Sequence, residues 1–318
     1  RVVDANGVGL GRKAFRRIAQ QANNAVIPPV LHPGLREVAT LSMDGCLKRL
    51  GISRKKMRQD DPALGVSGNG AGMDALVHAL RELGVRVEIE VSAEELEERV
   101  HKEMLTAAFY VDDRDDALRM ITRSGVLDEI QMLDTAIYAL ARNTRLKRIP
   151  LYLECSQSLE AWLNQEGIET VRIGREEGEV WETLKDQDDG QTAFLVLTEP
   201  VCAAVLCAKM TLADPAWVDT PVLRQGDVVT VMREIDCAHE RLGTLIKELS
   251  ADIDPKDRLL VEGVRVRHNE GFALVQPHAS RARCRIVCRA SNEEFASELA
   301  AMYEKRVQGI LGRDGKKG

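Results

Sequence analysis

Two loops of this sequence carry residue types suited to chemistry with metal ions and phosphate. The acidic loop Asp112-Asp113-Arg114-Asp115-Asp116 offers carboxylates, which are ligands that hard cations such as Mg²⁺ prefer. The turn Gln276–Ala282 contains His278, Ser280 and Arg281, whose side chains can hold an anion together with amides of the turn. The sequence therefore predicts a metal loop and an anion-binding turn.

Glycine-rich turns form a second group of candidates. The turn Gly68–Gly72 follows an apolar segment, and Gly7-Val-Gly9-Leu-Gly11 precedes a basic helix that begins near Arg12 and Lys13. A helix that starts after such a turn can bind phosphate, so an unrelated nucleotide-binding α/β enzyme is one interpretation and a plain tight turn is the other. The dinucleotide fingerprint is not met, because Glu88 and Glu90 lie inside the next strand.

These loops need elements that position them, and the hydrophobic periodicity predicts such elements. Ser92 begins a Ser-x-x-Glu pattern that is typical of a helix N-terminus. Alternating strands and helices indicate βαβ units and a largely parallel sheet. The predicted strands are 63–67, 85–91, 107–111, 149–154, 169–173 and 192–197, and the predicted helices are 74–83, 93–104, 129–141, 158–165, 179–185 and 226–249.

The last part of the chain has a different rhythm. Strands are predicted at 258–267, 271–276 and 283–290, followed by one helix at 292–311. This order describes a small α+β module with its sheet first and its helix last. We interpret polar segments further upstream as domain boundaries. The sequence therefore predicts four domains and a tail, at 1–61, 62–111, 112–254, 255–312 and 313–318.

Composition narrows the class of protein. The 318 residues carry a net charge of −6 and 4% aromatic side chains, so nucleic-acid binding is not expected. No apolar run reaches the roughly 18 residues of a membrane span, and a cytoplasmic protein without a membrane partner is expected. Seven scattered cysteines without a CxxC pair indicate buried thiols rather than zinc. The absent initiating Met indicates a processed chain or a piece of a longer one.

The stretch from Val261 to Glu294 resembles the last domain of the α-D-phosphohexomutases, the superfamily of phosphoglucomutase, phosphomannomutase and phosphoglucosamine mutase. That domain reads roughly DGVKV…GW.LVRPSGTEP, and its RPSGTEP turn grips the substrate phosphate. The matching turn in this sequence keeps the proline, as Pro277. Where the superfamily has Arg, Thr and Glu, this sequence has Gln276, Ser280 and Arg281. The resemblance implies a phosphate site at His278, Ser280 and Arg281, and a retained turn with lost function is the alternative.

Segments further upstream are similar to the same superfamily in order. The acidic loop stands where the superfamily has its Mg²⁺ loop DGDADR, which implies Mg²⁺ as cofactor with Asp112 and Asp116 as ligands. Arg114 places a cation at a ligand position, so a charged solvent loop is the other interpretation. The superfamily's sugar-reading GGEESGH loop is matched only by Glu199, which implies sugar binding there.

The phosphorylated serine of the superfamily lies in a TASHNP string, which this sequence does not contain; Ser67 is the hydroxyl to test. The resemblance implies an α/β fold of successive mixed βαβ domains of phosphohexomutase type with a small C-terminal α+β domain. Three functions remain open: a sugar-phosphate-binding protein with eroded catalytic motifs and weak or no mutase activity, an active mutase, or the nucleotide-binding enzyme above. Hexose phosphate is the implied partner. The pattern also resembles the degenerate mutase module fused behind, or associated with, a sugar-nucleotidyltransferase.

Overall fold

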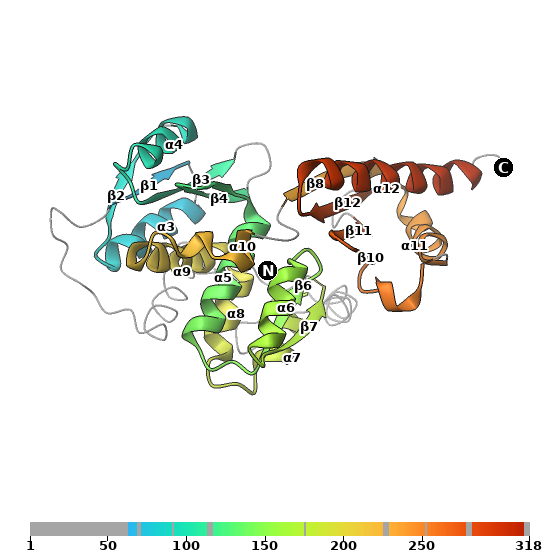
Figure 1. Ribbon diagram of the computed structural model, residues 1–318, viewed down its shortest axis with the longest axis horizontal. Coiled ribbons are helices and arrows are strands. Elements are labelled where there is room, and N and C mark those ends of the chain that lie inside the picture. The colour runs from blue at the N-terminus through green and yellow to red at the C-terminus, as the bar shows by residue number, and fades with distance from the viewer. Residues whose placement is uncertain are drawn as a thin grey trace, which may run out of the picture. The chain divides into compact units, whose positions relative to one another are not determined.

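The computed structural model describes residues 63–68, 71–90, 92–112, 117–174, 176–224, 229–251, 253–277 and 282–314 (Figure 1). These residues form two compact units. The first unit holds the described residues up to Pro150 together with Gly167–Val171 and Arg175–Thr220. The second holds Leu151–Glu166, Arg172–Gly174 and the described residues from Pro221 onward.

The first unit is built on a five-stranded mixed sheet with the order β2-β1-β3-β4-β5. Strand β1 pairs in parallel with both of its neighbours and is buried along its whole length, as expected for a strand covered on both faces. Strands β4 and β5 are antiparallel additions. The bounds are β1 Ala63–Ser67, β2 Arg86–Ile89, β3 Ala107–Asp112, β4 Ala117–Thr122 and β5 Gly125–Leu127.

Helices pack on this sheet and on one another. Helices α3 and α4 contact its strands, and α5, α8 and α9 pack together as a helical layer. The predicted capping residue Ser92 is confirmed, because its hydroxyl accepts a hydrogen bond from the Glu95 amide at 3.1 Å. The bounds are α3 Ala71–Glu82, α4 Ala93–His101, α5 Glu129–Asn143, α7 Glu177–Leu184, α8 Gly190–Thr198 and α9 Pro200–Ala213, with a 3₁₀ turn at Trp217–Asp219.

The predicted strand at 192–197 is wrong, since these residues lie in helix α8. A short apolar run is compatible with either a buried strand or a buried helix, and periodicity alone cannot distinguish them. Helix α8 is buried nearly all round, which removes the polar face that would have revealed its 3.6-residue period. Among the described residues no single helix has the length and hydropathy of a membrane span; α8 and α9 meet that test only as a pair bent by 107°.

Helix α5 begins with a complete capping box. The Asp128 carboxylate accepts from the Gln131 amide at 2.8 Å, and the Gln131 side chain accepts from the Asp128 amide at 2.9 Å. We expect Asp128→Ala to lower the free energy of unfolding by about 1 kcal/mol, because it removes an acceptor for helix N–H groups. Urea unfolding followed by circular dichroism measures this loss. Asp128→Asn keeps the acceptor and should differ little from the native protein, so an equal loss in both variants would contradict the capping role.

Strands β6 (Arg148–Tyr152) and β7 (Glu169–Ile173) form a two-stranded sheet, and helix α6 (Gln157–Gln165) connects them. Between β6 and α6 the chain makes a tight turn, in which Ser156 caps the helix through a 3.2 Å bond from the Leu159 amide. This turn, Leu153–Ser156, is buried throughout and belongs to the second unit.

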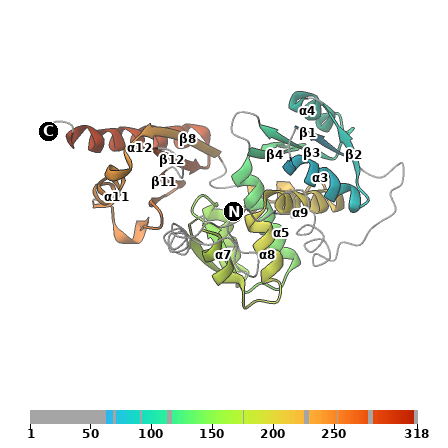
Figure 2. The ribbon, with the colours of Figure 1, turned by 180° about the vertical axis from the view of Figure 1, so that it is seen from behind.

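The second unit is dominated by a five-stranded antiparallel sheet with the order β8-β12-β11-β10-β9. Helix α12 runs along strands β8 and β12 in both ribbon views (Figure 1 and Figure 2). The bounds are α10 Pro221–Arg224, β8 Val229–Asp236, α11 Leu242–Ala251, β9 Arg258–Leu259, β10 Val264–His268, β11 Gly271–Pro277, β12 Arg283–Ala290 and α12 Glu293–Asp314, with 3₁₀ turns at His239–Arg241 and Pro255–Asp257.

The predicted helix over 226–249 is wrong in its first half. Residues of β8 pair along their whole length with β12, so this segment closes one edge of the sheet. Val231 and Ile235 pack against the core while Met232 and Glu234 are exposed, which is the two-residue period of a strand. The single strand predicted at 258–267 is divided into β9 and β10 by a bend at Leu260–Gly263.

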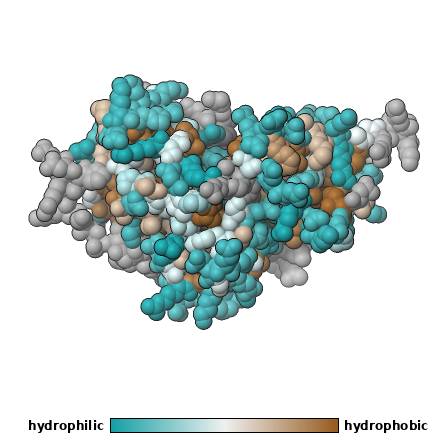
Figure 3. All heavy atoms as spheres, viewed as in Figure 1, coloured by the Kyte–Doolittle hydropathy of each residue, from teal (hydrophilic) through white to brown (hydrophobic). Residues whose placement is uncertain are grey.

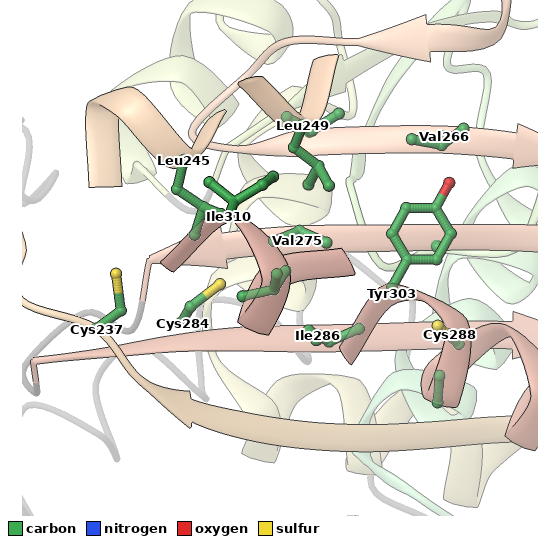
Figure 4. Packing of buried hydrophobic residues seen from close by; sticks show 14 of the residues in the cluster. Cys237, Leu245, Leu249, Val266, Val275, Cys284, Ile286, Cys288, Tyr303 and Ile310 are labelled. Atoms are coloured by element: carbon green, nitrogen blue, oxygen red, sulfur yellow. The ribbon is translucent and has the colours of Figure 1, made fainter. Parts of the chain in front are cut away.

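One face of the C-terminal sheet carries the core of the unit. Side chains from alternate residues of β10, β11 and β12 meet α11 and α12, with Tyr303, Leu249 and Ile310 pointing toward the strands (Figure 4). The six described cysteines are buried, as the sequence predicted. Burial raises the pKa of the Cys288 thiol to about 12, so this residue acts as a small apolar side chain.

Large exposed hydrophobic side chains are few among the described residues. They are scattered, and the face in Figure 3 shows hydrophobic residues as separate spots in a mainly hydrophilic surface. Scattered apolar residues are normal on a protein surface and mark no docking site by themselves.

Candidate functional site

The predicted anion-binding turn connects two strands of the C-terminal sheet. Strand β11 ends at Pro277 and β12 begins at Arg283, close to the predicted bounds, and the last pairs before the turn are Gln276 with Arg285 and Pro277 with Cys284. His278, Ser280 and Arg281 lie outside the described residues. The strands that lead into the turn are paired along seven positions, so its two ends are fixed in the sheet.

A buried carboxylate joins both of these strands at the base of the turn. Glu154 is 2% exposed, and its Oε1 accepts from Arg285 Nη2 at 2.6 Å and from Gln276 Nε2 at 3.2 Å. The cation of this pair is more accessible, since the Arg285 side chain is 25% exposed. Glu154 comes from the turn between β6 and α6, so a segment far away in sequence reaches the candidate site.

Two further arginines of the C-terminal sheet donate to backbone carbonyls of Leu153–Ser156, the turn that carries Glu154. Arg289 is 1% exposed and donates to the Glu154 carbonyl at 3.0 Å, and Arg265 donates to the Leu153 carbonyl at 2.9 Å. The Arg265 guanidinium also lies 3.9 Å from the centre of the Phe272 ring, a cation–π contact. The face of the sheet opposite the apolar core therefore carries several arginines beside apolar side chains such as Phe272.

A fourth arginine, which lies in β7, also donates to the backbone of the turn Leu153–Ser156. Arg172 donates to the carbonyls of Tyr152 and Cys155 at 2.7 Å each and of Ser156 at 3.0 Å, and it pairs with the Glu160 carboxylate at 2.7 Å. Burial by itself raises the pKa of Glu160, but the hydrogen bond and charge of Arg172 outweigh burial, so the pKa lies below its usual value. Glu154 is thus presented by a turn whose carbonyls are all engaged by fixed cations.

Sequence reasoning did not identify Glu154, Arg265, Arg285 or Arg289 as functional. A signal was present in β12, where basic residues at 283, 285 and 289 alternate with the apolar residues 284, 286 and 288, interrupted only by Val287 within this strand. Such alternation in a strand predicts one apolar and one basic face. It does not reveal which segment covers the basic face.

Within the first unit, the structure brings two other candidates to one edge of the sheet. Ser67 ends β1 and pairs with Tyr110 of β3, and β3 ends at Asp112. Because β1 and β3 are parallel, their carboxyl ends and the loops that follow lie at the same edge. Ser67 is 5% exposed. Asp116 lies outside the described residues, and nothing is described of the Asp112 side chain.

Glu199 occupies the break between α8 and α9 rather than a loop after a strand. Its carbonyl accepts from the amides of Cys202 and Ala203, and Pro200 at the first position of α9 sets the start of that helix. The Glu199 side chain is half-buried. Its assignment to sugar binding stays a prediction.

Among the described residues, no three His, Cys, Asp or Glu side chains gather as a metal site. The acidic loop that the sequence nominates for Mg²⁺ includes 113–116, which are outside that set. Among the described residues, Asp112 is the last residue of β3, so the acidic loop begins at the carboxyl edge of the sheet.

Comparisons with known proteins agree on one fold. The chain aligns with a phosphoglucomutase/phosphomannomutase family protein from Burkholderia thailandensis with a TM-score of 0.53 and 17% identity, covering 85% of this chain and 65% of that one. It aligns with a phosphomannomutase-type protein from Thermus thermophilus with a TM-score of 0.53 and 17% identity, covering 96% and 74%. At this level of identity the likeness establishes the fold alone.

A shorter match exists among curated sequences. A stretch of 76 residues is 32% identical to a probable phosphoglucosamine mutase from Methanosarcina acetivorans, which is 24% of this chain and 17% of that protein. No family model matches the chain. The chain spans about two thirds of the Burkholderia structure, and the curated match covers a small part of its relative.

Proposed function

Because the chain has the fold of the α-D-phosphohexomutases, we propose that it binds the phosphate group of a hexose phosphate at the turn that joins β11 to β12. The observation that carries this proposal is the position of Arg285, which stands at the second strand pair before that turn with its side chain 25% exposed. Guanidinium groups and hydroxyls suit phosphate oxygens, and the turn adds Ser280 and Arg281.

The finer proposal is that mutase activity is weak or absent. Gln276 stands where the superfamily has Arg, Arg281 where it has Glu, and Arg114 at a metal-ligand position. A loop with an inserted cation holds Mg²⁺ less well, because the cation and the ion repel each other. Asp112 and Asp116 would hold the ion, which supplies charge neutralisation during phosphoryl transfer when bound. Ser67 remains the candidate phosphoryl carrier, and Glu199 the candidate sugar contact.

The expected cellular location and protein partner follow from the same proposal. A protein that binds hexose phosphates works where these metabolites are found, so we place it in the cytoplasm. A fused or associated nucleotidyltransferase remains part of the proposal, because the eroded loops resemble those of such modules.

The test is a thermal melt of the full chain with and without ligand. At a glucose 6-phosphate or mannose 1-phosphate concentration 100 times the Kd, binding stabilises the folded state by about 2.7 kcal/mol, which shifts the melting temperature measurably. Unphosphorylated glucose and mannose are the matched controls, and the double variant Ser280→Ala, Arg281→Ala should lose most of the shift. Equal stabilisation by the sugars without phosphate would refute a phosphate site, and a shift with ATP or NAD alone would favour the nucleotide-binding alternative.

Activity is tested by intact-mass measurement of the purified protein. A stoichiometric phosphoryl group that disappears in Ser67→Ala would overturn the proposal of weak or absent activity and support an active mutase. An unmodified mass, together with stabilisation by sugar phosphates, is the expected result.

A further inference from the structure

We propose that strand β8 is an interface through which two copies of this chain pair edge to edge, about a twofold axis at Met232. The two copies of β8 run antiparallel, so the two C-terminal sheets continue as one antiparallel sheet. This inference concerns a surface of the second unit and does not depend on the proposed phosphate site.

Strand β8 stands at one edge of the C-terminal sheet. Among the residues that the structure describes, its pairing partner is β12, which it follows over its whole length of 8 residues. An edge of this length presents a row of backbone N–H and C=O groups to another strand. The opposite edge is β9, whose 2 residues are too few to offer such a row. The sheet therefore has one edge that is suited to pairing.

The alternation of hydrogen bonds identifies the residues of β8 that point outward. The amide of Cys237, the residue after β8, donates to the Ala282 carbonyl at 2.9 Å, in continuation of the β8–β12 register. By the two-residue period of antiparallel pairs, the odd-numbered residues of β8 bond toward β12 and the even-numbered residues point away from it. Met232 is such a residue, and its carbonyl accepts from the exposed Arg233 guanidinium at 3.2 Å. A second strand exchanges this exposed contact for a backbone bond.

Strand β8 lacks the features that usually keep an edge strand from pairing. It contains no proline, glycine or lysine, and no bulge interrupts its register with β12. Its two carboxylates are paired within their own sheet, because the Arg283 guanidinium donates to Glu234 at 2.8 Å and to Asp236 at 2.9 Å. The negative charges that would repel a partner strand are therefore offset.

Charge selects the register of the pair. Two identical antiparallel strands have one residue that faces its own copy across the twofold axis. With Arg233 or Glu234 at that position, two like charges would be opposed, which is unfavourable. With Met232 there, two apolar residues that are each 50% exposed cover each other, and Thr230 faces Glu234 of the second copy. This register also aligns the outward N–H and C=O groups of the even-numbered residues.

Helix α12 contributes a second layer to the same interface. It packs on β8 and β12, and Arg233 Nε lies 4.0 Å from the Glu304 carboxylate. Since Arg233 is next to Met232, this ion pair lies beside the twofold axis, which brings the same pair of the second copy near it. Two arginines and two glutamates then gather about the axis. This complementarity favours a second copy over a partner that carries charge of one sign.

The experiment measures self-association of the full chain by sedimentation equilibrium between about 1 and 200 µM. A strand pair with one helix contact is a small interface, so we expect a dimer with a Kd of about 1–10 µM. Met232→Lys should raise the Kd about tenfold or more, because two ammonium groups replace the apolar contact at the axis.

The matched control is Met302→Lys. Met302 is 48% exposed, close to the value for Met232, and it lies in α12 two residues before Glu304. Two residues correspond to about 200° around a helix, so Met302 lies on the other flank of α12 from Glu304. The same substitution there should leave the Kd within about twofold of that of the unsubstituted chain.

A cross-link tests the register directly. Residues that face each other in a hydrogen-bonded antiparallel pair have Cα atoms about 5.5 Å apart, which a disulfide can span. Met232→Cys should therefore form a covalent dimer when oxidised glutathione is the oxidant, and Met302→Cys should not. The unsubstituted chain is the control for the native cysteines.

The outcomes are separable. A dimer that Met232→Lys weakens and Met302→Lys does not, with the far-UV circular dichroism of both variants unchanged, supports the proposal. A chain that stays monomeric up to about 200 µM overturns it. A dimer that the two variants affect equally overturns it as well, since that dimer uses another surface. If Met232→Lys does not fold, the cross-link decides: no covalent dimer of Met232→Cys overturns the pairing of β8.

Discussion

Replacing Arg172 with methionine should lower the free energy of unfolding of the second unit by about 3 kcal/mol, the lower end of the cost of removing one partner from a buried ion pair, because the Glu160 side chain is 21% exposed. The side chain is 7% exposed, and its two Nη atoms donate to three carbonyls and to Glu160 at 2.7 to 3.0 Å. Methionine fills a similar volume but leaves the Glu160 carboxylate and three carbonyls without these donors.

The matched control is Arg148→Met. Arg148 pairs with Glu169 at 2.9 Å on the same two-stranded sheet, but both side chains are about half exposed, so its loss should cost less than about 1 kcal/mol. Urea unfolding of both variants, with hydrogen exchange to assign the loss to residues 151–166, gives the comparison. Equal losses in the two variants would contradict the role assigned to Arg172.

The cost of Arg172→Met should also depend on pH. The pKa of Glu160 is held below its usual value in the folded protein, so its contribution to stability is full above the unfolded pKa of about 4.3 and is lost as the pH falls through the folded pKa. Without Arg172 the pKa of Glu160 rises, because burial then acts with less opposition. The variant therefore takes up a proton at a higher pH than wild type, and the difference in stability should shrink as the pH falls from neutral through the unfolded pKa of about 4.3. A difference that stays constant would show that Glu160 is not the group concerned.

A second large effect is expected at Gly271, where β11 begins. A Cβ atom there would lie 1.9 Å from the Arg289 carbonyl oxygen and 2.8 Å from the Ala290 Cα, both backbone atoms of β12. Because the end of β12 is paired on one side with β11 and on the other with β8, its backbone cannot rotate away, so Gly271→Ala must separate the strands there, and we expect a loss of about 3 kcal/mol or more.

The control is Gly309→Ala in α12, where an added Cβ meets nothing within 4 Å. That substitution should stabilise the helix by about 0.5–1 kcal/mol, because alanine restricts the unfolded chain and favours the helix. In thermal melts, the melting temperature should fall in Gly271→Ala and rise in Gly309→Ala. Since Gln157 also bonds to the Gly271 carbonyl, the loss at Gly271 should be accompanied by faster hydrogen exchange at the start of α6.

Local periodicity was a good guide at several elements that have one polar and one apolar face. Strands β2 and β7 and helices α4 and α5 lie within a few residues of their predicted bounds. It failed at α8, which is buried nearly all round, and at β8, whose mixed residues pair with a strand about 50 positions later. In both cases the local sequence does not show which distant element packs against or pairs with the segment.

The sequence by itself determined the βαβ rhythm, the small C-terminal module and the two strands that hold the candidate turn, because each of these is written in residues close together in the chain. Only the tertiary structure decided that a carboxylate at position 154 meets Gln276 and Arg285, the latter separated from it by 131 residues. The physical reason is that side-chain spacing specifies which face of an element is buried, whereas the partner of a buried charge depends on which distant segment packs against that face.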